Sequence, residues 1–182
     1  MRGIRTAFRA RGVFLVCAAL TTACASNELP PLVPLYEESA AEESTPLGGE
    51  QLANRKHEMQ SAYRDMIHFH TTLESLNQRR DQNGFILFRG FLDEYMGVHL
   101  DPLLRSEWQS RHPELMALDA NLRLMKADVL IQMHTPRRIQ QVIDEVRVRF
   151  EGRGDMLVDY PVGSQGTLEE ALEILGKRKW RG

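Results

Sequence analysis

Apolar side chains recur at helical spacing through most of the chain after residue 51. In the first such segment successive apolar positions lie 7, 3, 4, 3, 4 and 3 residues apart, which places them on one face of a long helix. They are Leu52, Met59, Ala62, Met66, Phe69, Leu73 and Leu76. Asn83-Gly84 is expected to end this helix. A coiled-coil seam has the same spacing, so the pattern leaves a coiled coil and a bundle helix both open.

A second segment, from Phe85 to Leu100, is rich in aromatic residues. Their 3, 3, 4 spacing again predicts a helix, with Phe85, Phe88, Phe91 and Tyr95 near one face. The stretch FILF alone also fits a buried strand. Gly90 and Gly97 lie seven residues apart and would permit close helix packing, although each glycine weakens a helix.

Three further helix starts are predicted where a proline can occupy the first turn, because the missing N–H has no intrahelical partner there. They follow Asp101-Pro102, His112-Pro113 and Thr135-Pro136, and Asp101 and Thr135 are good N-caps. Two of these helices have clear apolar stripes, at Leu115, Leu118, Leu122, Met125, Val129 and Met133 and at Ile139, Val142, Ile143, Val146 and Phe150.

Residues 152–155 break the helical pattern, and residues 156–166 are expected to be extended or irregular. A last helix is predicted from Thr167, whose side chain forms a capping box with Glu170. Apolar stripes on helices joined by short connections are typical of one shared core. The predicted fold is therefore an all-α, compact bundle of about five helices over residues 51–182.

Charge is distributed unevenly before residue 51. Residues 1–23 hold four arginines and no acid, whereas residues 25–50 hold six glutamates and no base. The remainder then has 23 − 4 = 19 basic and 25 − 6 = 19 acidic residues. This neutral balance argues against nucleic-acid binding. Residues 24–50 are also rich in proline, and we interpret them as an acidic tether, either a spacer or a leader of no selected length.

The N-terminus has the three parts of a secretory signal, assigned to residues 1–23. A basic segment, MRGIRTAFRARG, precedes the apolar VFLVCAAL and the small-residue region TTACAS. The apolar run from Val13 to Leu20 is far shorter than the ~20 residues of a spanning helix. Ordinary cleavage after Ala25 would also fit the small residues around it.

Leu20-Thr21-Thr22-Ala23-Cys24 resembles the lipobox of bacterial lipoproteins. The resemblance implies that Cys24 carries the lipid, palmitate included, which holds the chain to a membrane. The match covers these five residues and departs from the pattern in that leucine stands four, rather than three, positions before the cysteine. Ala25 and Ser26 lack the aspartate that retains such proteins at the inner membrane. The outer membrane facing the periplasm is therefore implied. With Cys17 inside the signal, the mature domain has no free thiol.

Histidine is the residue type that suggests a ligand site. His68 and His70 would share a face on a strand but diverge by ~200° on a helix, which argues against joint chelation. His70 has Glu74 one turn later, either as a supporting carboxylate or as an ordinary surface partner. A ligand pocket is hypothesised from His70, Glu74, Phe88, Tyr95 and His99. No metal or cofactor is predicted.

No catalytic motif is present: the sequence has no H-E-x-x-H, G-x-S-x-G or G-x-x-x-x-G-K pattern. We therefore expect a non-enzymatic interaction or scaffold module of the bacterial envelope. It would be anchored through Cys24 and would bind another envelope protein through a helical face. The alternative is a periplasmic helical bundle that binds a small ligand or metal. An exposed apolar patch would favour the first function.

Overall fold

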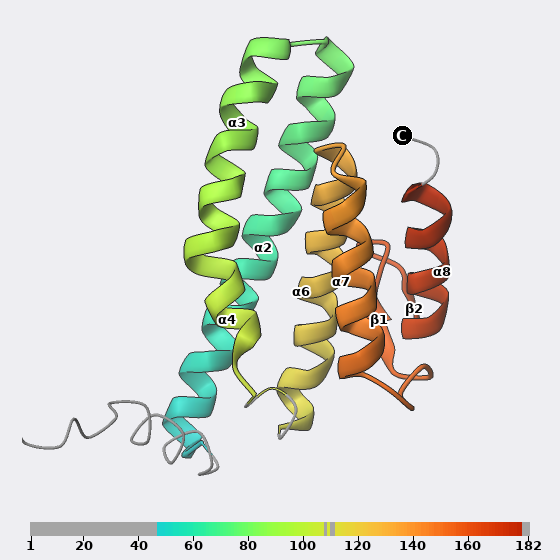
Figure 1. Cartoon of the computed structure of the whole chain (residues 1–182). Helices are drawn as coiled ribbons and strands as arrows, with labels where there is room; N and C mark the ends of the chain where they lie inside the picture. The colour runs from blue at the N-terminus through green and yellow to red at the C-terminus, as the bar shows by residue number, and fades with distance from the viewer. Residues whose placement is uncertain (1–46, 108, 110–111, 180–182) are drawn as a thin grey trace, which may run out of the picture. The chain divides into compact units, whose positions relative to one another are not determined.

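The computed structural model describes residues 47–107, 109 and 112–179 (Figure 1). The predicted signal, the lipobox with Cys24, and the tether up to residue 46 lie outside the described residues. The elements are α2 (Gly49–Arg79), α3 (Gln82–Tyr95), the π-helical turn η1 (Met96–Leu100), α4 (Asp101–Arg105), α6 (Pro113–Gln132), α7 (Pro136–Arg149), β1 (Leu157–Asp159), β2 (Gln165–Thr167) and α8 (Leu168–Lys179).

The prediction of an all-α compact bundle of about five helices is confirmed. None of the described helices combines the length and the apolar character needed to cross a membrane.

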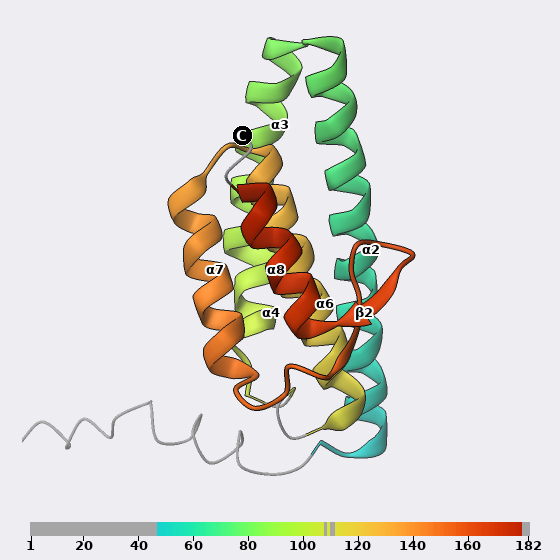
Figure 2. The same cartoon turned by 90° about the vertical axis from the view of Figure 1, so that its right-hand side faces the viewer.

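Helix α6 is the centre of the bundle, and α2, α7, α8 and β1 pack around it (Figures 1 and 2). A helix covered on all sides should be apolar around its whole circumference. Twelve of its 20 residues are buried accordingly, and they lie on every face rather than on one stripe. Its core side chains include Leu115, Leu122, Met125 and Val129.

Three of the buried residues on α6 are charged, and two of them, Asp119 and Arg123, form one cluster that ties α6 to its neighbours. The Asp119 carboxylate accepts hydrogen bonds from Arg123 Nε at 3.0 Å and from Arg149 Nε, on α7, at 2.5 Å. Arg149 also donates to the Ser106 carbonyl at 2.8 Å. Arg123 donates to the carbonyl of Leu104, at the end of α4. This Asp119 cluster therefore joins α4, the connection after it, α6 and α7.

The turn between α2 and α3 differs from the prediction. Helix α2 ends at Arg79, and Arg80 caps it in the left-handed conformation with φ 56°. Asp81 then caps α3 by accepting a hydrogen bond from the Gly84 N–H at 2.9 Å. A Cβ at Gly84 would lie 2.5 Å from the Asp81 carboxylate. Asn83-Gly84 is thus inside the first turn of α3, where glycine gives room for the cap, and its assignment as a helix stop was wrong.

Helix α4 begins at the predicted Asp101-Pro102, with proline in its first turn, but it continues the preceding helical path. The path from α3 continues through η1 into α4, and the Asp101 N–H donates to the Met96 carbonyl. The wider π turn releases a backbone bond, so Pro102 can follow without ending the helix. The Asp101 side chain pairs with Lys126 at 2.7 Å rather than acting as a cap. The alternative that FILF forms a strand is excluded, because residues 85–88 are helical.

The remaining boundaries agree well with the sequence. Helices α6 and α7 begin at Pro113 and Pro136, although the Thr135 hydroxyl donates to the Leu130 carbonyl instead of capping α7. Strands β1 and β2 form an antiparallel hairpin within the segment predicted to be extended. Thr167 and Glu170 make both bonds of the predicted capping box, at 2.9 and 3.3 Å.

Replacing Asp119 by alanine should destabilise the fold strongly. It would leave the Arg123 and Arg149 guanidiniums without their shared carboxylate, and breaking a buried ion pair costs ~3–5 kcal/mol. Urea denaturation of the full chain measures the change. Asp144→Ala is the matched control, because Asp144 is exposed on α7 and its loss should cost less than ~0.5 kcal/mol. Equal stability of both variants would contradict a structural role for the Asp119 cluster.

Candidate functional site

The outward face of α3 and η1 carries an apolar patch, which consists of Ile86, Leu87, Phe91 and Val98. Their exposed fractions are 66%, 77%, 48% and 60%. They are four of the seven large apolar side chains that are strongly exposed among the described residues. Helix α3 packs chiefly against α2, so its opposite face is uncovered (Figures 1 and 2). Clustered apolar exposure of this kind is typical of a contact surface.

Two glycines lie on the same uncovered side. A Cβ built at Gly90 or Gly97 would meet no heavy atom within 4 Å, leaving aside the helix's own nearby backbone. Neither glycine is therefore required for packing within the described part of the chain. Because a glycine inside a helix costs ~1 kcal/mol relative to alanine, Gly90 weakens α3 and gains no internal contact in return.

The patch is supported from beneath by a cluster of aromatic rings. Phe69 of α2 meets Phe88, Phe91 and Tyr95 of α3 edge-on, with ring centroids 5.9, 5.6 and 4.9 Å apart. Edge-to-face contacts at these distances stabilise aromatic pairs beyond their burial. Phe91 therefore packs against Phe69 on one side although about half of its surface is exposed.

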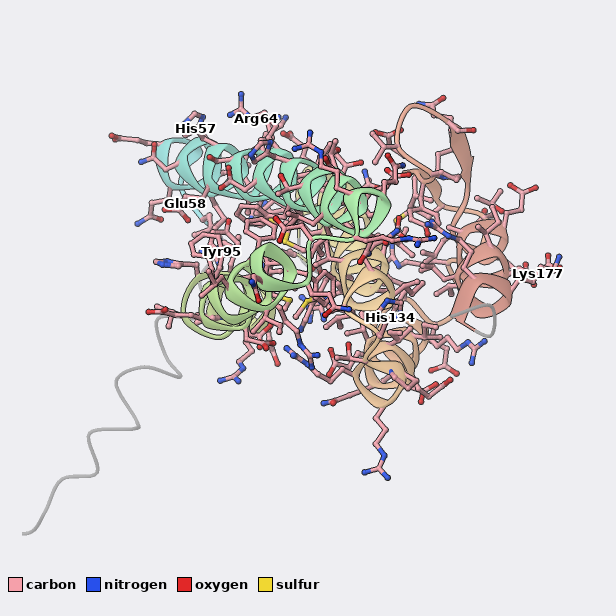
Figure 3. All side chains as sticks on the ribbon, turned by 90° about the horizontal axis from the view of Figure 1, so that it is seen from above. His57, Glu58, Arg64, Tyr95, His134 and Lys177 are labelled. Atoms are coloured by element: carbon pink, nitrogen blue, oxygen red, sulfur yellow. The ribbon has the colours of Figure 1, made fainter. Side chains whose placement is uncertain are left out.

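A groove of about 520 Å³ lies beside this cluster, between α2 and the η1–α4 segment. Tyr95 and His99 line it together, with ring centroids 5.4 Å apart. The Tyr95 hydroxyl donates to Asp65 of α2 at 3.0 Å. Figure 3 shows Tyr95 and Glu58 on the side where α2 and α3 face each other. Burial, and after it the hydrogen bond and charge of Asp65, raise the pKa of Tyr95 well above its usual range.

The five residues of the hypothesised pocket do not line one cavity. Tyr95 and His99 share the groove, Phe88 belongs to the aromatic cluster, and Glu74 is exposed. His70 faces α6, where its Nε2 lies 3.4 Å from Oδ2 of Asp128. The carboxylate nearest His70 is thus Asp128 and not Glu74, the residue one helical turn away.

Asp128 is the centre of a second polar cluster, which sequence reasoning missed. Arg178 of α8 lies 2.8 Å from its Oδ1 and donates to the Tyr160 hydroxyl at 3.0 Å. Neither Oδ1 of Asp128 nor Nε2 of His70 makes a well-aligned hydrogen bond, although both atoms are buried. Burial, and then the charge of Asp128, raise the pKa of Tyr160, while Arg178 opposes the shift. This cluster connects α2, α6 and α8.

A metal site receives no support from the described residues, in which no three histidine, cysteine, aspartate or glutamate side chains group as ligands. The two clusters around Asp119 and Asp128 instead pair each carboxylate with arginine, which would oppose a cation. The sequence signal that could have found them is the presence of Asp119, Arg123 and Asp128 within an otherwise apolar run.

Comparison with protein-family models, curated proteins and solved structures finds nothing that matches this chain.

The raised tyrosine pKa values predict loss of stability in alkali. The folded chain holds these phenol protons to higher pH than the unfolded chain, whose tyrosines titrate near the ordinary pKa of about 10. This contribution is complete below that pH and is lost as pH rises above it. Tyr95→Phe should therefore make the decline of unfolding free energy above pH ~10 shallower, while Tyr63 and Tyr160 retain the rest of the slope. Urea denaturation between pH 8 and 11 measures this, and parallel profiles would contradict it.

Proposed function

We propose that this chain is a membrane-anchored envelope lipoprotein whose helical domain is a non-enzymatic interaction module. The lipid on Cys24 would hold it to the membrane, with the outer membrane facing the periplasm as the proposed site. The apolar patch on α3 and η1 would bind an apolar helix of another envelope protein. The observation that carries the proposal is the clustering of Ile86, Leu87, Phe91 and Val98 on one uncovered helix face.

The geometry of this face suits a helical partner. Open space above Gly90 lets a second helix backbone approach closely. Ile86 and Leu87 would flank that approach, and Phe91, packed against Phe69, would act as the anchor. Anchors of this type dominate binding energy at protein interfaces, where a well-packed aromatic side chain contributes ~2 kcal/mol or more. Covering the patch would also remove the exposed apolar area from water, at ~25 cal/mol per Å².

The groove beside Tyr95 favours a second candidate function, binding of a small periplasmic ligand. Its volume of about 520 Å³ is in the range of ligand sites. Arg55, Glu58 and His99 supply polar groups on its wall, and the buried Nε of Arg55 makes no hydrogen bond. A ligand that binds there should raise the melting temperature, and the rise should disappear in His99→Ala.

Gly90→Gln should separate partner binding from folding. Glutamine is a better helix former than glycine and its Cβ meets open space, so the domain should be as stable or more stable by up to ~1 kcal/mol. The same side chain would keep a partner helix at a distance. A photoreactive amino acid at Leu87 should therefore crosslink one discrete partner in host cells, and Gly90→Gln should abolish that product without lowering the melting temperature.

The control for this crosslink is the same photoreactive residue at Leu157. Leu157 is 62% exposed but lies on β1, away from α3. It should give no such product. If the Leu87 product persists in Gly90→Gln, or if Leu157 captures the same protein equally, the proposed role of the α3 face is wrong.

The anchor is tested at Cys24. Replacing this cysteine by serine should remove a diacyl or triacyl mass from the chain and release it from the membrane fraction, because the lipid is its proposed attachment to the bilayer. Intact mass spectrometry of protein extracted from its host measures the change. A wild-type chain that begins after Ala25 and carries no lipid would show that the signal is cleaved in the ordinary way.

A further inference from the structure

A larger groove lies on another side of the molecule, between α4 and α7, and has a volume of about 1070 Å³. Helix α6 lies between these two helices and provides the floor (Figure 1). Arg138 of α7 forms an ion pair with Asp93 of α3 at one end. Arg149 of α7 bonds to the Ser106 carbonyl beyond α4 at the other. We call this space the α4–α7 groove.

The lining of the α4–α7 groove is strongly charged, with six cations and three acids. The cations are Arg105, Arg123, Lys126, Arg137, Arg138 and Arg149, and the acids are Asp101, Asp144 and Glu145. Ligand pockets are more often lined by apolar side chains with a few polar groups. Cations therefore outnumber acids in this lining, which favours an anionic ligand over a neutral one.

Internal ion pairs account for only part of this positive charge. Lys126 pairs with Asp101, Arg138 with Asp93, Arg123 and Arg149 with Asp119, and Arg123 also with Glu145. Arg105 and Arg137 are exposed and have no acidic partner within 4.0 Å among the described residues. They lie on opposite walls, on α4 and α7 respectively. Both are therefore available to an external anion.

The floor of the groove holds two further cations, which a flat binding partner outside the groove could not contact. Arg123 and Lys126 lie three residues apart on α6 and are mostly buried, with side-chain exposures of 7% and 12%. A lysine ammonium has three donors, and Lys126 uses one of them on Asp101. The Arg123 guanidinium is engaged by Asp119, the Leu104 carbonyl and Glu145, so Lys126 is the recessed cation that a ligand would enter the groove to meet. This geometry disfavours a membrane surface as the binding partner.

Apolar side chains and acids in the same lining narrow the chemistry further. Leu104, Leu130 and Val142 of the lining are buried in the core, whereas Val148 is 78% exposed and offers an apolar contact. Asp144 and Glu145 would repel a uniformly charged polyanion such as a nucleic acid or a polyphosphate. The match is a chain that combines carboxylates with apolar side chains, namely an acidic peptide. Arg137 and Arg149 are ~18 Å apart along α7 at 1.5 Å per residue, a span of five to six extended residues.

We infer that the α4–α7 groove binds an extended acidic peptide segment of a partner protein, with carboxylates at Arg105 and Arg137 and an apolar side chain on Val148. Arginine suits this role because its planar fork binds carboxylates in pairs. The groove shares no residue with the apolar patch on α3, so this inference is independent of the partner proposed for that patch.

The test uses the full chain and a fluorescein-labelled peptide of about eight residues in which glutamate and leucine alternate. Fluorescence anisotropy should show saturable binding that weakens as salt is raised. Charge reversal in Arg105→Glu/Arg137→Glu should weaken it by about tenfold or more. Neither arginine has an internal ion pair, so the variant should fold normally.

The matched control is Arg64→Glu/Arg79→Glu, which changes the net charge equally at exposed arginines of α2. Figure 3 shows Arg64 on the outer side of α2, away from α3 and α7. This control, and Gly90→Gln on α3, should bind the peptide as the wild type does. Normal peptide binding by Gly90→Gln would show that the groove acts independently of the α3 interface, so the two proposals can be rejected separately.

Several outcomes would overturn the inference. The inference is wrong if the wild-type chain does not bind the peptide saturably. It is also wrong if the control variant Arg64→Glu/Arg79→Glu loses as much affinity as the groove variant. Equal binding of a peptide with glutamine in place of glutamate would show that charge does not determine the affinity. Displacement of the peptide by inorganic polyphosphate at equal charge concentration would show that the groove binds simple polyanions instead.

Discussion

The structure depends on three charged residues buried on the central helix α6. Asp119, Arg123 and Asp128 each meet a different set of neighbours: α7, the carbonyl end of α4, and α8 with α2. Such pairs add little stability compared with apolar packing, but an unpaired buried charge is very costly. Each neighbouring helix must therefore lie in one register along α6. Apolar contacts alone would tolerate sliding by a turn, because leucine, methionine and valine recur on every face of this helix.

This arrangement also determines what is left open. Because α6 is covered by α2, α7, α8 and β1, the remaining helix, α3, packs chiefly on α2 and keeps one face uncovered. Helices α4 and α7 both bond to α6 through the Asp119 cluster and stay apart from each other, which creates the charged groove. The apolar patch and the α4–α7 groove thus both follow from the packing around α6. The patch is apolar because α3 lies away from the buried charges of α6. The groove is charged because it lies directly above them.

Local signals in the sequence predicted the elements well, and long-range pairing explains most of the failures. Prolines at 113 and 136 and the Thr167–Glu170 box mark real helix starts because each acts within one turn. Helix α4 starts at Asp101 as predicted, but Asp101 does not act as its N-cap, because its partner, Lys126, is 25 residues away and competes with capping. Long-range pairing also explains why the sequence did not reveal the partner of His70. Spacing along one helix indicates Glu74, whereas the packing of α2 on α6 brings Asp128 to it. Tyr95 and His99 were found together because both follow one helical path.

The proposed contact outside the domain would explain the α3 face. A folded domain is stable by only ~5–15 kcal/mol, so features that lower stability without an internal role need another explanation. Gly90 weakens α3 relative to alanine, and its Cβ position is empty. Leu87 and Val98 expose most of their surface, where a polar helix former would be at least as stable and more soluble. Phe91, in contrast, packs against Phe69. A glycine that weakens α3, next to a well-packed Phe91 side chain, gives an isolated bundle no advantage. It gives one when a second helix lies across Gly90, because the glycine then allows close approach and the exposed side chains become buried.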